Sequence, residues 1–197
     1  MTFKTLVIFD WDNTLFPSTF LASNSCTLLC STVPTSIQEQ ISKLEQNAIS
    51  IITTAQQHGQ VAIITNAEST WVELSCHKYF PNLFPILESI TIISAQTTFK
   101  PYHPNDPTQW KLLAFEKLIN DNPHINHIVS IGDSDYEHDA CRHIAKTNPN
   151  ITTKLIKLTE LPSIDIMYLQ MSLIIKAFTN IHERIYHTEL SIISTII

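Results

Sequence analysis

The stretch that decides the fold runs from Thr5 to Leu15 and reads T-L-V-I-F-D-W-D-N-T-L. Its first five residues are β-rich and mostly apolar without alternation, as in a strand buried on both faces of a parallel sheet. Two carboxylates, Asp10 and Asp12, follow directly after this run. Because ligands bind at the carboxyl ends of strands in open parallel sheets, the stretch predicts a central strand with an acidic site at its end.

Strands and helices alternate along the rest of the chain. Apolar, β-rich runs indicate further strands at residues 61–64, 90–93, 127–131 and 154–157. Apolar residues at helical spacing predict helices at residues 37–58, 69–79, 108–120 and 136–146. Gly59 is placed to end the first of these helices as a C-cap. The alternation predicts the α/β class, a Rossmann-like, doubly wound parallel sheet of about five strands with helices on both faces.

The length of 197 residues allows one sizeable domain. We expect residues 1–160 to form the core, with residues 17–35 as no more than a small lid and little or no cap domain. Residues 161–197 are expected to be a helical segment, packed on the core or leading to a further domain. The run Ser191 to Ile197 is an unusual end for a complete protein and suggests that the chain is part of a longer one.

Composition excludes several classes of function. The chain is 44% hydrophobic and 15% charged, which is ordinary for a globular protein. Its only two glycines, Gly59 and Gly132, exclude the Gly-rich loops of nucleotide-binding folds. A net charge of −6 without any run of Lys or Arg makes nucleic acid and anionic membranes poor partners. An anionic substrate would therefore need a metal ion or a well-placed lysine.

No targeting or metal-binding pattern is evident from cysteines, histidines or hydropathy. Cys26 and Cys30 could share a helical face, but small buried hydrophobic residues are the simpler interpretation. Asp10 and Asp12 interrupt the first apolar run, so a signal peptide is not expected. The longest uncharged C-terminal stretch, residues 166–175, is about half of what a transmembrane segment needs. We expect a soluble protein without a transmembrane segment, in a reducing compartment such as the cytoplasm.

Polar residues at three predicted strand ends indicate the chemistry of the site. Asp10, Thr65 and Asp133 each close such a strand, so they should converge on one crevice. One carboxylate can attack phosphorus to give an acyl-phosphate, while a second protonates the leaving alkoxide and then deprotonates water. Because two carboxylates and a phosphate repel one another, the site requires a cation.

The same residues could hold that cation and the substrate. Asp10, the backbone carbonyl of Asp12 and Asp133 offer the hard oxygen ligands that Mg²⁺ prefers. The Thr65 hydroxyl and the Asn66 amide suit a phosphoryl oxygen. These assignments predict an Mg²⁺-dependent site that binds a phosphorylated substrate.

The motifs resemble those of the haloacid dehalogenase (HAD) superfamily over residues 5–157. Its first motif, D-x-D-x-T-L after an apolar strand, is matched from Asp10 to Leu15, and its second by Thr65 at a strand end. Its fourth, G-D with a second acid four residues on, is matched from Gly132 to Glu137, with Glu in place of the usual Asp. The resemblance implies an aspartyl phosphatase that uses Asp10 as nucleophile, Asp12 as acid/base and Mg²⁺ as cofactor.

Two assignments stay open within this resemblance. The motif lysine, which would neutralise Asp10 and the phosphoryl group, is Lys111 or Lys100. We favour Lys111, because a single helix between it and Asp133 is the more natural spacing in the family. The second acid, which would hold a metal-bound water, is Glu137, with the neighbouring acids as alternatives, namely Asp135 and Asp139.

The resemblance also limits the reaction. An acid in the position of Asp12 favours hydrolysis of a phosphate monoester over dehalogenase or transport-ATPase chemistry. Without a large cap the site would be open, so we expect a bulky substrate such as a phosphoprotein, with phosphotyrosine as the specific case. The alternatives are a phosphatase of a small metabolite, a phosphotransferase or mutase, and a non-catalytic HAD-fold binding module that engages a partner through the C-terminal helix.

Overall fold

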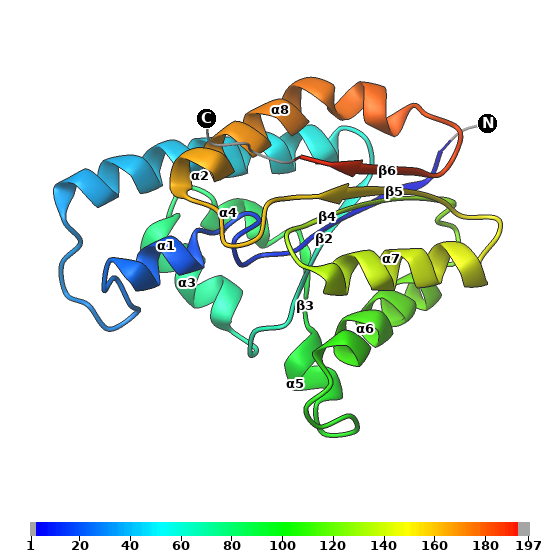
Figure 1. Ribbon diagram of the computed structural model, residues 1–197, viewed down its shortest axis with the longest axis horizontal. Coiled ribbons are helices and arrows are strands. Elements are labelled where there is room, and N and C mark those ends of the chain that lie inside the picture. The colour runs from blue at the N-terminus through cyan, green and yellow to red at the C-terminus, as the bar shows by residue number, and fades with distance from the viewer. Residues whose placement is uncertain (1–2, 193–197) are drawn as a thin grey trace.

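The computed structural model describes residues 3–192, and within them six parallel strands form one sheet in the order β3-β2-β1-β4-β5-β6 (Figure 1). The strands are β1 (Thr5–Phe9), β2 (Gln60–Thr65), β3 (Thr91–Ser94), β4 (His127–Gly132), β5 (Thr152–Lys157) and β6 (Thr188–Ser191). The predicted α/β, Rossmann-like parallel sheet is confirmed, with six strands in place of five. β1 lies at the centre, between β2 and β4.

Helices cover both faces of the sheet (Figure 1). The longer ones are α2 (Thr35–Gln56), α6 (Pro107–Asp121), α7 (Asp135–Thr147) and α8 (Ile164–His182). The shorter ones are α1 (Ser18–Ser23), α3 (Trp71–Tyr79), α4 (Phe84–Leu87) and α5 (Ala95–Phe99). Because side chains of a strand alternate between faces, Val7 and Phe9 of β1 pack in the core under α2 and α8, and Leu6 and Ile8 pack under α6 and α7.

The prediction that Gly59 is the C-cap of α2 was wrong, because the helix ends at Gln56 and Gln57 occupies the cap position. Among the described residues no glycine has a positive φ, and the residue after the helix, Gln57, has ordinary right-handed helical geometry. A Cβ atom at Gly59 would collide with the backbone carbonyl of Thr5. Glycine is therefore required here for close packing between the start of β2 and β1.

The C-terminal segment is helical only in part. α8 packs along α2, where the Asn47 amide donates to the Tyr168 carbonyl (3.0 Å) and to the Ser172 hydroxyl (2.9 Å). The expectation of a helical segment is wrong for residues 188–191, which form β6 and pair in parallel with β5. α8 is thus the crossover helix of a βαβ unit. Residues 193–197, which include most of the apolar end of the chain, lie outside the described part.

Residues 17–35 form a small appendage in place of a separate domain. They contain α1 and a loop that hydrogen bonds tie to α3: the Lys78 ammonium donates to the Leu28 carbonyl (2.8 Å), and the Tyr79 hydroxyl donates to the Thr27 carbonyl (2.7 Å). Within residues 3–192, every helix is too short or too polar to span a bilayer.

Candidate active site

A tight turn after β1 places two carboxylates beside each other. The Trp11 carbonyl accepts hydrogen bonds from the backbone N–H groups of Leu15 (3.0 Å) and Phe16 (2.9 Å). Asn13 within the turn has a φ of 56°, a left-handed conformation that asparagine tolerates better than most residues. The turn folds the chain back on itself, so that Asp12 lines the same cavity as Asp10.

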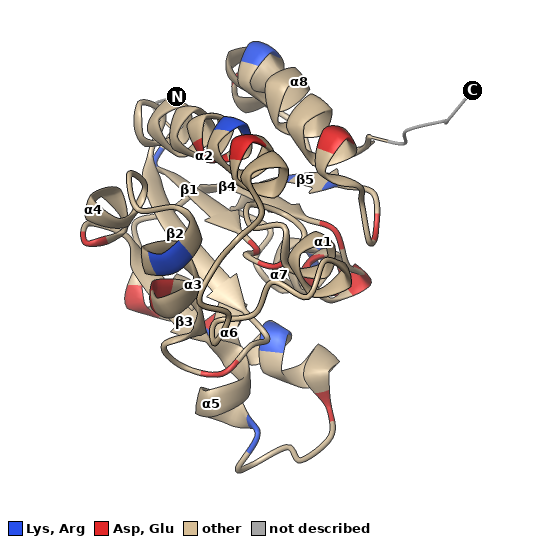
Figure 2. Cartoon of the chain, turned by 90° about the vertical axis from the view of Figure 1, so that its left-hand side faces the viewer, with Lys and Arg blue, Asp and Glu red and all other residues tan. Residues whose placement is uncertain are grey.

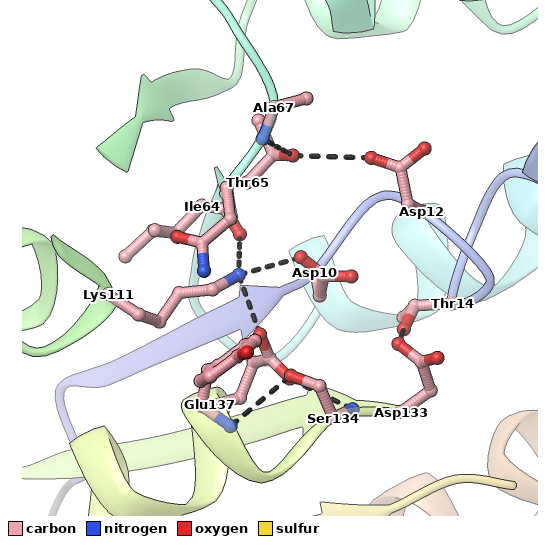
Figure 3. A network of polar contacts seen from close by, with 12 residues as sticks. Asp10, Asp12, Thr14, Ile64, Thr65, Ala67, Lys111, Asp133, Ser134 and Glu137 are labelled. Atoms are coloured by element: carbon pink, nitrogen blue, oxygen red, sulfur yellow. Dashed lines mark hydrogen bonds and ion pairs between the residues drawn. The ribbon is translucent and has the colours of Figure 1, made fainter. Parts of the chain in front are cut away.

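The carboxyl ends of β1, β2 and β4 meet at a cavity of about 360 Å³. It is lined by Asp10, Asp12, Asn13, Thr65, Asn66, Ala67, Lys111, Asp133, Ser134, Tyr136 and Glu137. The structure therefore brings together every residue favoured for the site from the sequence, although these lie far apart along the chain. Figure 3 shows side chains converging from the strand ends and from the starts of α6 and α7, namely those of Asp10, Asp12, Thr65, Lys111, Asp133 and Glu137.

Lys111 lies at the centre of this network (Figure 3). Its ammonium contacts Asp10 Oδ1 and Glu137 Oε1, each at 2.7 Å, and donates to the Ile64 carbonyl at 2.6 Å. The side chain is fully buried. The ammonium therefore donates to Asp10 and to the Ile64 carbonyl and forms an ion pair with Glu137, so it joins two carboxylates that come from distant parts of the chain.

The alternative lysine lies elsewhere. Lys100 follows α5, is exposed to solvent, and lines a separate cavity with Gln96, Thr97 and Pro101. Of the two candidate lysines, Lys111 is therefore the one that contacts Asp10. The reason is topological, since α6 begins next to the end of β2 and α5 leads away from it.

Glu137 has a structural role that the sequence analysis missed. Its Oε2 accepts from the Ser134 N–H (3.1 Å) and from the Ser134 hydroxyl (2.5 Å), while Ser134 caps the start of α7. This is a capping box, and the S-x-x-E spacing is a readable sequence signal for it. The other acids considered, Asp135 and Asp139, are exposed and pair with Lys157 and Arg142.

Burial first, and then the charges around Lys111, shift the pKa values of the neighbouring groups. Burial raises the pKa of Asp10 well above its usual value; Lys111 opposes this, and Glu137 adds to it. Burial also works to raise the pKa of Glu137, but Lys111 outweighs it and holds that pKa below its usual value. Burial would lower the pKa of Lys111, but both carboxylates raise it above its normal range. Lys111 therefore stays protonated.

Two further acids add to the excess of negative charge. Burial, followed by the nearby Glu137, raises the pKa of Asp133 to about 7. Burial also raises the pKa of Asp12, against a hydrogen bond from Trp71 that lowers it. Asp10, Asp12, Asp133 and Glu137 thus face the buried ammonium of Lys111 and the partly buried one of Lys157, which donates to the Asp133 carbonyl at 2.6 Å. Negative charge is still in excess, so a further cation would stabilise the charged forms of the acids.

The donor set fits Mg²⁺, although the side chains alone do not make a cage. Within residues 3–192, no three His, Cys, Asp or Glu side chains are grouped as they would be around a metal ion. Mg²⁺, however, usually binds through one or two carboxylates and keeps several water ligands. Asp133 is suited to such a role: in the described part of the chain, the side-chain hydrogen bond to its Oδ1 is a long one of 3.4 Å from the Thr14 hydroxyl.

Thr65 and Asn66 occupy different positions in the cavity. The Thr65 hydroxyl accepts from the Ala67 N–H (3.0 Å) and donates to Asp12 Oδ2 over 3.4 Å. The Asn66 amide donates to the Pro107 carbonyl at 3.2 Å, at the start of α6. Asn66 therefore ties the end of β2 to the helix that carries Lys111, a link that sequence reasoning did not foresee.

Positive charge around the site is limited to isolated side chains. Figure 2, which looks onto the end of the molecule where α1 and α3 lie, shows Lys and Arg as short segments on separate elements.

Comparison of the chain with protein-family models, with curated proteins and with solved structures finds no match. The resemblance of the strand-end motifs to the HAD superfamily therefore stays a hypothesis, and the chemistry has to be inferred from the cavity itself.

Proposed function

We propose that the chain is an Mg²⁺-dependent phosphatase that hydrolyses a phosphate monoester through an aspartyl-phosphate on Asp10. One observation carries the proposal: the Lys111 ammonium lies 2.7 Å from Asp10 Oδ1 in a cavity that also contains Asp12. A buried carboxylate held against a fixed cation is oriented as a nucleophile. A second carboxylate beside it can move protons.

The proposed roles follow from these positions. An Asp10 oxygen attacks phosphorus, the bond to the ester oxygen breaks, and Asp12 donates a proton to the leaving alkoxide. In the second step Asp12 takes a proton from water, which attacks the aspartyl-phosphate and releases phosphate and the free Asp10 carboxylate. Lys111 stabilises the charge that develops on the phosphoryl oxygens.

The remaining residues would hold the substrate and the metal. Mg²⁺ would bind to Asp10, Asp133 and the backbone carbonyl of Asp12, with Glu137 reaching it through water. When bound, it would neutralise the phosphoryl group. The Thr65 hydroxyl lies within the cavity and could turn from Asp12 to a phosphoryl oxygen. The Asn66 amide has one N–H bond beyond the one that Pro107 uses.

The open surroundings of the cavity favour a large substrate. Residues 17–35, which follow the first motif, contain the six-residue helix α1 and are too short for an enclosing cap. A phosphorylated side chain of a protein could therefore enter, and phosphotyrosine, with its long flat ring, is the preferred case. Hydrolysis of a small phosphometabolite is the alternative that the same chemistry allows.

The test is a panel of phosphopeptides, phosphometabolites and an aryl phosphate, each assayed with and without Mg²⁺. We expect hydrolysis that requires Mg²⁺ and that Asp10→Asn abolishes, while Asp121→Asn retains it. Asp121 is an exposed acid on α6 that pairs with Lys117 away from the cavity, so it is a matched control. Far-UV circular dichroism establishes that both variants are folded. Undiminished turnover by Asp10→Asn would contradict the assignment of the nucleophile.

A further inference from the structure

The acid/base candidate Asp12 is held by a side chain that the chemistry above does not use. The indole N–H of Trp71 donates to both carboxylate oxygens of Asp12, at 3.0 Å to Oδ1 and 3.2 Å to Oδ2. The Thr65 hydroxyl donates to this carboxylate over a longer 3.4 Å, and the Ser18 hydroxyl, which donates to Asn13 Oδ1 at 3.3 Å, is a further donor near it. The indole is therefore the main constraint on the orientation of Asp12.

Trp71 is itself fixed by the fold. It is the first residue of α3, and its ring packs edge-on against Phe16 with the ring centroids 6.1 Å apart. Its carbonyl accepts a hydrogen bond of 2.6 Å from the Ser75 hydroxyl. The preceding residue, Thr70, has a φ of 71°, a left-handed conformation that is unfavourable for a β-branched side chain. Such strain persists only where the surrounding structure requires it, and here it sets the start of the helix that carries Trp71.

An indole suits this position chemically. It donates one hydrogen bond, accepts none and does not titrate, so it cannot compete with Asp12 for the proton. The N–H faces both oxygens of the carboxyl group. Whichever oxygen carries the proton, the other can still accept from Trp71. The same contact can therefore hold Asp12 in both halves of the proposed reaction.

A second cavity shows on which side of Asp12 the leaving group would lie. This cavity, of about 460 Å³, adjoins the first, and the two share Asp12 and Ala67. It is lined by Asp12, Leu28, Ala67, Glu68, Ser69, Thr70, Trp71 and Leu74. Asp12 thus stands between the phosphoryl site at Asp10 and a partly apolar recess. A proton donor is needed at that junction, because the ester oxygen would lie there.

We propose that Trp71 is a positioning residue that holds the Asp12 carboxyl group at the junction of the two cavities, where the leaving group departs. The proposal rests on the proposed phosphatase function. It adds that the leaving group lies on the side of Asp12 that faces Trp71. The recess beside Trp71 would receive the organic part of the ester, with the indole ring as one wall.

The kinetic test is Trp71→Phe, which keeps a ring that can pack against Phe16 but removes the N–H. An alkyl phosphate, whose leaving alkoxide needs a proton, is compared with 4-nitrophenyl phosphate, whose leaving group does not. We expect kcat/KM, which reports the steps up to formation of the aspartyl-phosphate and not the later attack of water, to fall about tenfold or more on the alkyl ester and clearly less on the aryl ester. Misplacing a catalytic group by about 1 Å can cost about a hundredfold. Trp110→Phe is the matched control: its indole donates to the His103 carbonyl outside the site, so the ratio of the two rates should stay within about twofold.

A second measurement does not depend on turnover. The three indole N–H groups have different acceptors: Ser75 for Trp11, Asp12 for Trp71 and His103 for Trp110. In Asp12→Ala, only the indole ¹H–¹⁵N signal of Trp71 should shift, and its hydrogen exchange should become several-fold faster. The absence of that signal in Trp71→Phe assigns it.

The outcomes separate the two claims. Equal losses of kcat/KM on both esters in Trp71→Phe, or a Trp71 signal that Asp12→Ala leaves unmoved, would overturn the positioning role while leaving the phosphatase function intact. A wild-type chain that hydrolyses neither ester in the presence of Mg²⁺ would overturn the proposed function and, with it, the role of Trp71 in catalysis.

Discussion

Replacement of Lys111 by methionine tests the centre of the site without depending on the substrate. Methionine is similar in length and fills most of the space, but it removes the positive charge and all three hydrogen-bond donors. Asp10 and Glu137, each 2.7 Å from the ammonium, would then face each other in the interior without a cation. The Ile64 carbonyl would lose its 2.6 Å hydrogen bond from the ammonium as well.

The size of the effect follows from burial. Removing one partner of a buried ion pair costs about 3–5 kcal/mol, because it leaves an uncompensated charge. Part of this loss returns when the carboxylates take up protons, since their pKa in the folded variant would lie above the unfolded value. A carboxyl group whose pKa is higher in the folded than in the unfolded state favours folding most at pH values below its unfolded pKa. This contribution to stability is lost as the pH rises through the folded pKa. The destabilisation by Lys111→Met should therefore be larger near pH 8 than near pH 5.

Urea unfolding of wild type, Lys111→Met and Lys100→Met at both pH values is the assay. Lys100 is the matched control, because it is exposed and lines a different cavity; we expect its replacement to change stability by less than about 0.5 kcal/mol. Lys111→Met should also lower kcat by about a hundredfold or more, as loss of a charge-stabilising donor does. A loss of stability below about 1 kcal/mol near pH 8, or equal effects of the two substitutions, would refute the account of Lys111 as a buried bridge.

Three further predictions follow from the same structure. Gly132→Ala should lower the free energy of unfolding by about 1–3 kcal/mol. The new Cβ would lie 2.7 Å from Glu137 Cγ, and Lys111 and Ser134 hold that side chain in place. An unchanged melting temperature would contradict this. Burial, with His182, lowers the pKa of His127 to about 3, so this group stabilises the fold above pH 6.5 and loses that contribution on acidification. Between about pH 6.5 and 5, the free energy of unfolding should therefore fall less in His127→Gln than in wild type, by up to about 2 kcal/mol. An equal fall in the two proteins would contradict this. Mg²⁺ should raise the melting temperature of wild type and not of Asp133→Asn, and an equal rise in both would exclude Asp133 as a ligand.

The strand-end motifs made most of the fold and site predictable. An apolar run followed by D-x-D indicates a buried parallel strand with acids at its carboxyl end, and parallel strands place such ends together. Asp10, Thr65 and Asp133 therefore reach one cavity in the structure as expected. Lys111 was harder, because nothing local in the sequence marks a helical lysine as buried. Its spacing to Asp133 favoured it over Lys100, and the packing of α6 beside β2 explains its contact with Asp10.

What sequence reasoning missed depends on contacts between distant segments. The hydrogen bond between Trp71 and Asp12 joins α3 to the turn after β1, and the periodicity of α3 says nothing about it. Gly59 was assigned to a helix cap because its local position allows one, whereas the packing of β2 against β1 is what requires it. β6 is short and lies at the sheet edge, so its pattern was too weak to separate from the helical segment before it.

The central claim is that a phosphoryl group is transferred to Asp10, and trapping that intermediate tests it most directly. Asp12→Asn should slow the water step more than the attack on an aryl phosphate, because an aryl leaving group needs no proton while water needs a base. Mixing this variant with an aryl phosphate and Mg²⁺, quenching in acid and mapping peptides by mass spectrometry should place one phosphoryl group on Asp10. Release of product with the phosphoryl group on another residue, or with none on the enzyme, would contradict the account.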